Sequence, residues 1–232
     1  MGYSYLKEIF MPWARERLRE AYWNNKWEKS NITYSARNNK PYDVRSFISY
    51  PSVILKDLII DIEETDTEDE KVLKVINYVF KNIKYKTDEG EYWAYPEDTY
   101  YKGFGDCEDH ACLVISILRN LGIPAYRLKV CCGFAYIKHL NQVVGHAYPI
   151  FLNSKNEWVS LDTTFYPDLT TLPSERMQAK DLEYYQNIWF CFNDVFSFSP
   201  KEVDIDNKRL RELNKDAKKN TSRPALKSRR AS

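Results

Sequence analysis

The chain has 232 residues, of which 44% are hydrophobic and 29% charged, a globular composition that excludes a disordered or membrane-spanning chain. Its 34 Lys and Arg residues balance 33 Asp and Glu residues, so the overall charge gives no reason to expect nucleic acid or an acidic surface as a partner. The apolar runs are far shorter than the roughly 20 residues that cross a bilayer, and the first ten residues show no secretory signal. We therefore expect no membrane anchor and, by default, a cytoplasmic protein, with association with a virion left open.

Residues 1–60 are predicted to form an N-terminal helical extension that packs on the core. Between Tyr5 and Trp27 the apolar residues recur at helical spacing, and acidic and basic residues are mixed on the other faces. This mixture favours a packing helix over a membrane-surface helix, which would need a strongly basic face. Residues 30–51 are expected to be loop with short extended pieces.

Two helices are predicted in the middle of the chain. Thr67 and Glu70 have the spacing of a capping box, and the apolar residues that follow predict a helix over 67–82. A second helix, apolar on most faces, begins near Cys107 after two glycines, at 103 and 105, and is ended by Gly122 and Pro124.

Beyond this helix the pattern changes to short segments rich in Val, Ile, Tyr and Phe, separated by turn residues. The segments 125–133, 143–152, 157–161 and 188–192 are predicted to be strands of an antiparallel sheet. The order of helices and strands predicts an α+β fold with a single compact domain over 61–200.

One constellation of residues suggests nucleophilic chemistry. Cys107 lies at the first turn of the second helix, where the helix N-terminus favours the thiolate. His146 follows Gly145 in a predicted strand, a position where a neighbouring backbone is expected to approach closely, and Asp162 ends the next strand. A thiol, a base and a carboxylate that orients the base form the general design of an activated nucleophile.

Four sequence blocks in this region resemble the transglutaminase-like core. They are G-D-C-E-D-H-A at 105–111, L-G-I-P-A-Y-R at 121–127, G-H-A-Y at 145–148 and W-V-S-L-D-T-T at 158–164. The resemblance covers about residues 67–166 and is closest to the bacterial transglutaminase-like cysteine peptidases. It implies a papain-like fold with the nucleophile at the N-terminus of a buried helix packed on an antiparallel sheet. It also implies Cys107 as nucleophile, His146 as base and Asp162 as the orienting carboxylate.

The activity that this resemblance implies is acyl transfer on protein or peptide amides through a thioester. Hydrolysis is expected, and crosslinking to an amine is the less favoured outcome. The backbone N–H of Cys107 is a candidate oxyanion donor, and Trp93 or Tyr95 is a candidate for the second donor. The alternative is a transglutaminase-like fold that serves without turnover as a scaffold or assembly component, for instance of a viral particle.

The remaining His, Cys and acidic residues are interpreted as structural. His110 is expected to be structural or to line the substrate wall, and His139 to be exposed in a loop. The other four cysteines lack metal-ligand spacing, and a disulfide framework is not expected from an odd number of cysteines. The three acids that flank Cys107 favour helix capping, although some relatives with this motif bind Ca²⁺, so calcium stays a minor alternative and no cofactor is predicted.

The last segment, 201–232, carries 11 basic and 5 acidic residues, a net charge of +6. Such a basic tail usually remains a solvated end, and any contact with nucleic acid or an acidic partner would be electrostatic. The predicted partner is a protein or peptide substrate.

Overall fold

The computed structural model describes residues 14, 16–25, 30–38, 40–58, 61–88, 90 and 92–199. Within the predicted N-terminal helix, residues 16–25 are helical, and the rest of that prediction lies largely outside the described residues. The basic tail 201–232 also lies outside them. Among the described residues, no helix has both the length and the apolar character needed to cross a membrane.

After the helical residues 16–25, the chain forms a small hairpin. Strands β1 (Thr33–Arg37) and β2 (Lys40–Asp43) pair antiparallel, and they are followed by the 3-10 helix η1 (Val44–Phe47) and the short helix α2 (Val53–Lys56). This agrees with the short extended pieces predicted for 30–51.

Helix α3 (Glu68–Asn82) begins as the sequence predicts. The Thr67 side chain accepts a hydrogen bond from the Glu70 backbone, and the Glu70 carboxylate accepts one from the Thr67 N–H, which completes the capping box. The residues of α3 that face the core are apolar and buried: Val72, Val75, Ile76 and Val79.

The segment after α3 leads the chain to Cys107. Strand β3 (Lys84–Tyr85) pairs in parallel with β4 (Phe104–Gly105), and helix α4 (Pro96–Lys102) lies between them in sequence. Gly103 ends α4 in the left-handed region, at a φ of 69°, which a residue without a Cβ adopts at little cost. The chain can therefore turn sharply out of α4 and run through β4 directly into the next helix.

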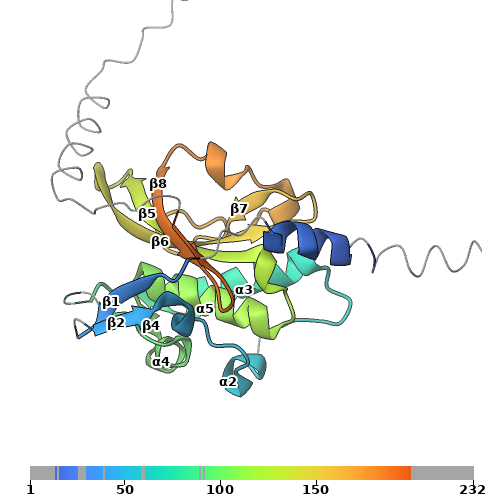
Figure 1. The fold of residues 1–232 in the computed structure, drawn as a ribbon, viewed down its shortest axis with the longest axis horizontal. Helices are drawn as coiled ribbons and strands as arrows, with labels where there is room; N and C mark the ends of the chain where they lie inside the picture. Colours follow the sequence, from blue (N-terminus) through green and yellow to red (C-terminus); the bar gives the residue numbers. More distant parts are fainter. Residues whose placement is uncertain are drawn as a thin grey trace, which may run out of the picture.

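That helix, α5 (Cys107–Asn120), is the centre of the fold. It is buried over nearly its whole length, because it contacts the sheet on one side and α2, α3 and α4 on others (Figure 1). This explains why its sequence is apolar on most faces. Gly122, at a φ of 91°, lies just past its end and donates its N–H to Arg119, so the predicted stop signal is confirmed.

The sheet has five strands in the order β7-β6-β5-β8-β9, all antiparallel. The strands are β5 (Leu128–Ile137), β6 (Gln142–Leu152), β7 (Trp158–Ser160), β8 (Tyr185–Phe192) and β9 (Ser197–Phe198), and three 3-10 helices lie around them, η2 (Ala125–Arg127), η3 (Pro173–Glu175) and η4 (Ala179–Asp181). A buried helix on an antiparallel sheet confirms the predicted α+β class and its architecture.

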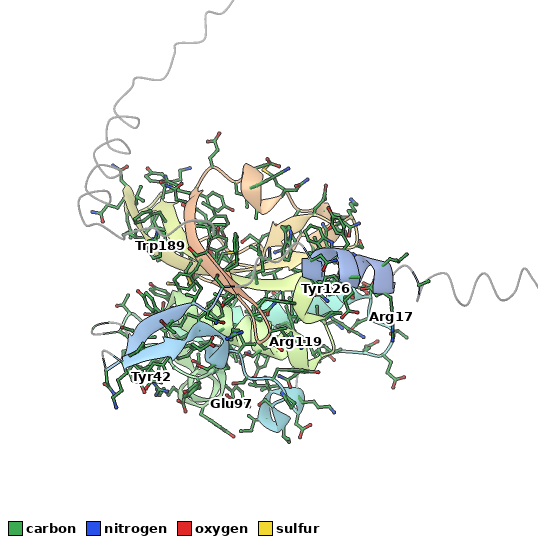
Figure 2. All side chains as sticks on the ribbon, viewed as in Figure 1. Arg17, Tyr42, Glu97, Arg119, Tyr126 and Trp189 are labelled. Carbon is green, nitrogen blue, oxygen red and sulfur yellow. The ribbon has the colours of Figure 1, made fainter. Side chains whose placement is uncertain are left out.

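The main hydrophobic core lies between α5 and the sheet, and the hairpin region contributes to it. Ala36, Val44 and Phe47 are fully buried together with residues of α3, α5, β5 and β6. A second, smaller cluster surrounds Tyr126 on another part of the sheet. Figure 2 shows Tyr126 close to the N-terminal helical residues, and its hydroxyl donates a hydrogen bond to Glu16.

Candidate active site

Cys107 is the first residue of α5 and stands in the wall of a cavity. Asp106 before it has an extended backbone (φ −99°, ψ −157°), so the chain enters the helix abruptly and leaves the Cys107 side chain at the tip. The thiol is half-buried, and it borders a cavity of about 290 Å³ to which His146 also contributes. The structure therefore brings the predicted nucleophile and the predicted base to the same cavity.

Two polar groups contact the sulfur of Cys107. The backbone N–H of Ala147, the residue after His146, donates a hydrogen bond to Sγ over 3.5 Å, and the Glu108 carboxyl lies 3.2 Å away. Burial raises the pKa of the Cys107 thiol well above its ordinary value, the Glu108 carboxylate raises it further, and the Ala147 N–H acts in the opposite direction. The thiol is therefore protonated at neutral pH in this environment, whereas its helical position alone would suggest a thiolate.

His146 and Asp162 form a buried pair. Nε2 of His146 lies 2.8 Å from Oδ2 of Asp162, and both side chains are almost completely shielded from solvent. An ionised carboxylate only accepts hydrogen bonds, so Nε2 carries the proton and Nδ1 keeps its lone pair. Nδ1 is buried and has no hydrogen-bond partner within the part of the chain that the structure describes. The imidazole can thus accept a proton at Nδ1.

The Asp162 carboxylate is held by further donors. The backbone N–H and the hydroxyl of Thr164 each donate to Oδ1 over 2.8 Å. Burial raises the pKa of Asp162, but the His146 imidazole and the Thr164 donors outweigh it, so the pKa lies below its ordinary value. Asp162 is therefore ionised at neutral pH although it is buried.

Aromatic rings enclose the imidazole. Phe165 meets the His146 ring edge to face at 4.9 Å, and Tyr148 lies nearly parallel to it at 5.7 Å. Tyr148 stacks in turn on Tyr185, with ring centroids 3.8 Å apart and planes 4° from parallel. The Tyr185 hydroxyl reaches Asp162 Oδ2 over 3.2 Å. Sequence reasoning did not find Tyr185, because no local pattern connects it to a carboxylate 23 residues earlier.

The rest of the cavity wall is aromatic and acidic. Trp93, a candidate oxyanion donor, lies in this wall, whereas the other candidate, Tyr95, does not line the cavity and stacks on Phe47. The backbone N–H of Trp93 is already bonded to Ala36, which leaves the indole N–H as its available donor. The cavity is lined by Tyr34, Tyr85, Gly90, Trp93, Asp106, Cys107, Glu108, Cys132, Gly145, His146, Ala147, Trp189 and Phe190.

Two glycines make room for neighbouring side chains in this region. A Cβ on Gly105 would lie 2.6 Å from the Cβ of Asp109, so only glycine fits there. A Cβ on Gly145 would lie 3.1 Å from the indole ring of Trp189. The sequence-based expectation that a backbone approaches Gly145 was wrong, since the approaching group is the side chain of Trp189.

Two of the acids around Cys107, Glu108 and Asp109, lie in the first turn of α5, where the sequence predicted that the helix N-terminus would favour them. Asp106 makes no side-chain capping hydrogen bond, Glu108 points to the sulfur, and Asp109 accepts the backbone N–H of Ala94 over 2.8 Å. Within the described residues, no group of three or more His, Cys, Asp or Glu side chains is arranged to hold a metal ion.

The other two histidines lie apart from the pair. His110 is buried and its Nδ1 lies 3.2 Å from the Thr163 hydroxyl, and burial lowers its pKa to about 4, so it stays neutral at pH 7. It does not line the cavity, which leaves the structural interpretation. His139 is exposed, as expected.

Part of the chain matches the model of a known family. Residues 56–163 match the family model described as the Transglutaminase-like superfamily, so this part of the chain is a transglutaminase-like domain. The match contains Cys107, His146 and Asp162. Among curated proteins, no sequence matches the chain.

Solved structures with a similar fold include LapG of Legionella pneumophila. The EGTA-treated form is 23% identical to this chain, covers 67% of this chain and 80% of LapG, and has a TM-score of 0.47. The calcium-bound form is 22% identical, covers 66% of this chain and 81% of LapG, and has a TM-score of 0.46. A candidate cysteine protease from Cytophaga hutchinsonii is 20% identical over 61% of this chain and 44% of its own, with a TM-score of 0.37.

Proposed function

We propose that this protein catalyses cysteine-dependent acyl transfer on protein or peptide amides, with hydrolysis as the main outcome. The observation that carries the proposal is the His146–Asp162 hydrogen bond, which leaves Nδ1 of a buried imidazole able to accept a proton beside the cavity that Cys107 borders. In this proposal Cys107 is the nucleophile, His146 the base and Asp162 the orienting carboxylate.

In the first step the thiol attacks the amide carbonyl. Because the pKa of Cys107 is raised, the thiol starts protonated, and we infer that His146 takes its proton at Nδ1 while the S–C bond forms. The negative charge moves to the carbonyl oxygen. The backbone N–H of Cys107, one of the helix N–H groups that lack a partner inside the helix, and the indole N–H of Trp93 are the proposed donors to that oxygen.

In the second step the protonated imidazole gives its proton to the leaving amine, the C–N bond breaks and a thioester remains on Cys107. Water then attacks the thioester while His146 accepts a proton from it, and the C–S bond breaks to release the acid and the thiol. An amine in place of water would give a crosslink. We favour hydrolysis because a water molecule needs no dedicated binding subsite, whereas an amine donor does.

The first experiment measures product formation with candidate proteins and a labelled primary amine. Cleavage without label incorporation supports a peptidase, and incorporation supports a transglutaminase. Both activities should disappear in Cys107→Ala and His146→Ala and persist in His139→Ala, which removes an exposed histidine. Equal turnover by His146→Ala and His139→Ala would contradict the proposal.

One observation favours a second function, a transglutaminase-like scaffold without turnover. Burial and Glu108 both raise the pKa of Cys107, and a protonated thiol is a weak nucleophile. Alkylation of Cys107 by iodoacetamide at neutral pH separates the two functions. A rate that falls in His146→Ala supports the enzyme, whereas a slow rate that does not depend on His146 supports the scaffold.

A further inference from the structure

We propose that Tyr185 is a positioning residue that fixes the Asp162 carboxylate and, through it, the tautomer and orientation of the His146 imidazole. This inference rests on the proposed function, because it assigns Tyr185 a part in preparing the base. Tyr185 lies at the start of β8, outside the segment 56–163 that matches the family model.

Tyr185 contacts the one carboxylate oxygen that also binds the imidazole. Its hydroxyl lies 3.2 Å from Oδ2 of Asp162, and His146 Nε2 lies 2.8 Å from the same atom. The Thr164 donors occupy the other oxygen, Oδ1. The carboxylate is therefore held at both oxygens, and Tyr185 fixes the end that faces the base.

The direction of each hydrogen bond around Tyr185 can be assigned from its neighbours. The backbone N–H of Asp162 donates to Ser160 Oγ over 3.2 Å, and Ser160 Oγ lies 2.7 Å from the Tyr185 hydroxyl. Because the carboxylate only accepts, the tyrosine proton points to Asp162, so the Ser160 proton points to Tyr185. The hydrogen bonds form a closed ring from the Asp162 N–H through Ser160 and Tyr185 back to the Asp162 carboxylate.

The tyrosine is held in this position from two sides. Its ring lies 3.8 Å from the ring of Tyr148, nearly parallel, and its backbone N–H donates to Leu182 over 3.0 Å. Burial and the nearby Asp162 charge raise the pKa of Tyr185 well above its ordinary value, so the hydroxyl keeps its proton at the pH where the base works. A hydroxyl fixed in this way can hold the carboxylate in one orientation.

Without the Tyr185 hydroxyl, Oδ2 of Asp162 loses one of the two hydrogen bonds described above and keeps the one to the His146 imidazole. The carboxylate is then freer to rotate. Judged by the usual strength of a hydrogen bond to a charged group, the lost positioning corresponds to roughly a tenfold to hundredfold effect. We expect the loss to appear in the reactivity of Cys107 through His146, and not in the stability of the fold, because phenylalanine keeps the stack on Tyr148.

The test compares Tyr185→Phe with Tyr184→Phe in the full chain. Tyr184 is the adjacent tyrosine, and it stacks on Tyr166 at 3.8 Å, so its substitution controls for the loss of a hydroxyl at this sheet edge. One readout is the rate of Cys107 alkylation by iodoacetamide at neutral pH. The second is the ¹⁵N NMR spectrum of the His146 imidazole, which reports directly which ring nitrogen carries the proton.

We expect Tyr185→Phe to slow the His146-dependent alkylation at least tenfold and to convert a single Nε2–H tautomer into a mixture, with the melting temperature close to that of Tyr184→Phe. Ser160→Ala, which removes the neighbouring member of the ring, should give a smaller change in the same direction. If Tyr185→Phe behaves like Tyr184→Phe in both readouts, the inference is wrong.

The two readouts separate the inference from the proposed function. If His146→Ala leaves alkylation of Cys107 unchanged, the proposed function fails, and Tyr185 is then judged by the imidazole spectrum alone. A changed tautomer in Tyr185→Phe would still support its positioning role, and an unchanged one would overturn it.

Discussion

Asp109 should make the stability of this protein depend on pH near neutrality, and Asp109→Asn should remove the part of that dependence that comes from Asp109. The side chain is 3% exposed and packs against Gly105, and its Oδ1 accepts the N–H of Ala94. Burial raises the pKa of Asp109 to about 7, although the Ala94 N–H acts against the rise. Asparagine has nearly the same shape and keeps an oxygen that can accept the same hydrogen bond.

The sign and size of the effect follow from proton linkage. An aspartate in the unfolded chain ionises near pH 4, whereas the folded protein resists ionisation up to about pH 7. The folded state therefore loses stability as the pH rises from about 4 to about 7, by up to about 4 kcal/mol for this one group, and about 3 kcal/mol of this falls above pH 5. Asparagine does not ionise, so its contribution stays constant.

The assay is urea unfolding at pH 5, 6, 7 and 8, with the free energy of unfolding compared between the native sequence and the variant. The difference between Asp109→Asn and the native protein should grow in favour of the variant by about 3 kcal/mol across this range. Asp181→Asn, at an exposed carboxylate, should show no such growth. A difference for Asp109→Asn that stays constant from pH 5 to pH 8 would refute the reasoning.

The remaining predictions concern the nucleophile, a helix cap and the core. Burial raises the pKa of Glu108 itself well above its ordinary value, so its charge acts on Cys107 only at a pH high enough to ionise it. At such a pH Glu108→Gln removes a charge that raises the pKa of Cys107, and the thiol should alkylate faster, measured by mass spectrometry; an unchanged rate would show that this charge does not act on the sulfur. Thr67→Ala removes the capping box of α3 and should lower the free energy of unfolding by about 1 kcal/mol, whereas an exposed Thr65→Ala should not. Phe151→Ala, at a fully buried position, should cost about 3–5 kcal/mol in urea unfolding, and a loss below about 1 kcal/mol would contradict the assigned core.

Much of the fold could be predicted because its signals are local. The capping box at Thr67 fixes the start of α3, and Gly122 ends α5 through its positive φ. Four of the five strands of the main sheet were found from their residue types, but their limits were less accurate, and β9 was not predicted. Strand β8 begins at Tyr185, three residues before the predicted start, because its pairing with β5 shifts register near Gly133, and no local pattern indicates such a shift.

The site was predictable only in part, for a physical reason. Cys107, His146 and Asp162 stand in recognisable sequence blocks, and the structure places the first two on one cavity and hydrogen-bonds the last two. That they act together in catalysis stays a prediction. The contact between Tyr185 and Asp162 depends on how β8 packs beside the distant segment after β7 that carries Asp162. The contact between Glu108 and the sulfur of Cys107 depends on the orientation of the Glu108 side chain. Neither contact leaves a pattern in the sequence.

The cavity wall draws on parts of the chain that the family match does not reach. Tyr34 comes from β1, and Trp189 and Phe190 come from β8, while the match ends at residue 163. A fragment cut to 56–163 would keep all three proposed catalytic residues but lose Tyr34, Trp189 and Phe190 from the cavity wall. It would also expose the edge of β5 that β8 covers. Trimming the protein to its recognisable segment should therefore yield an aggregating polypeptide in place of a minimal folded domain.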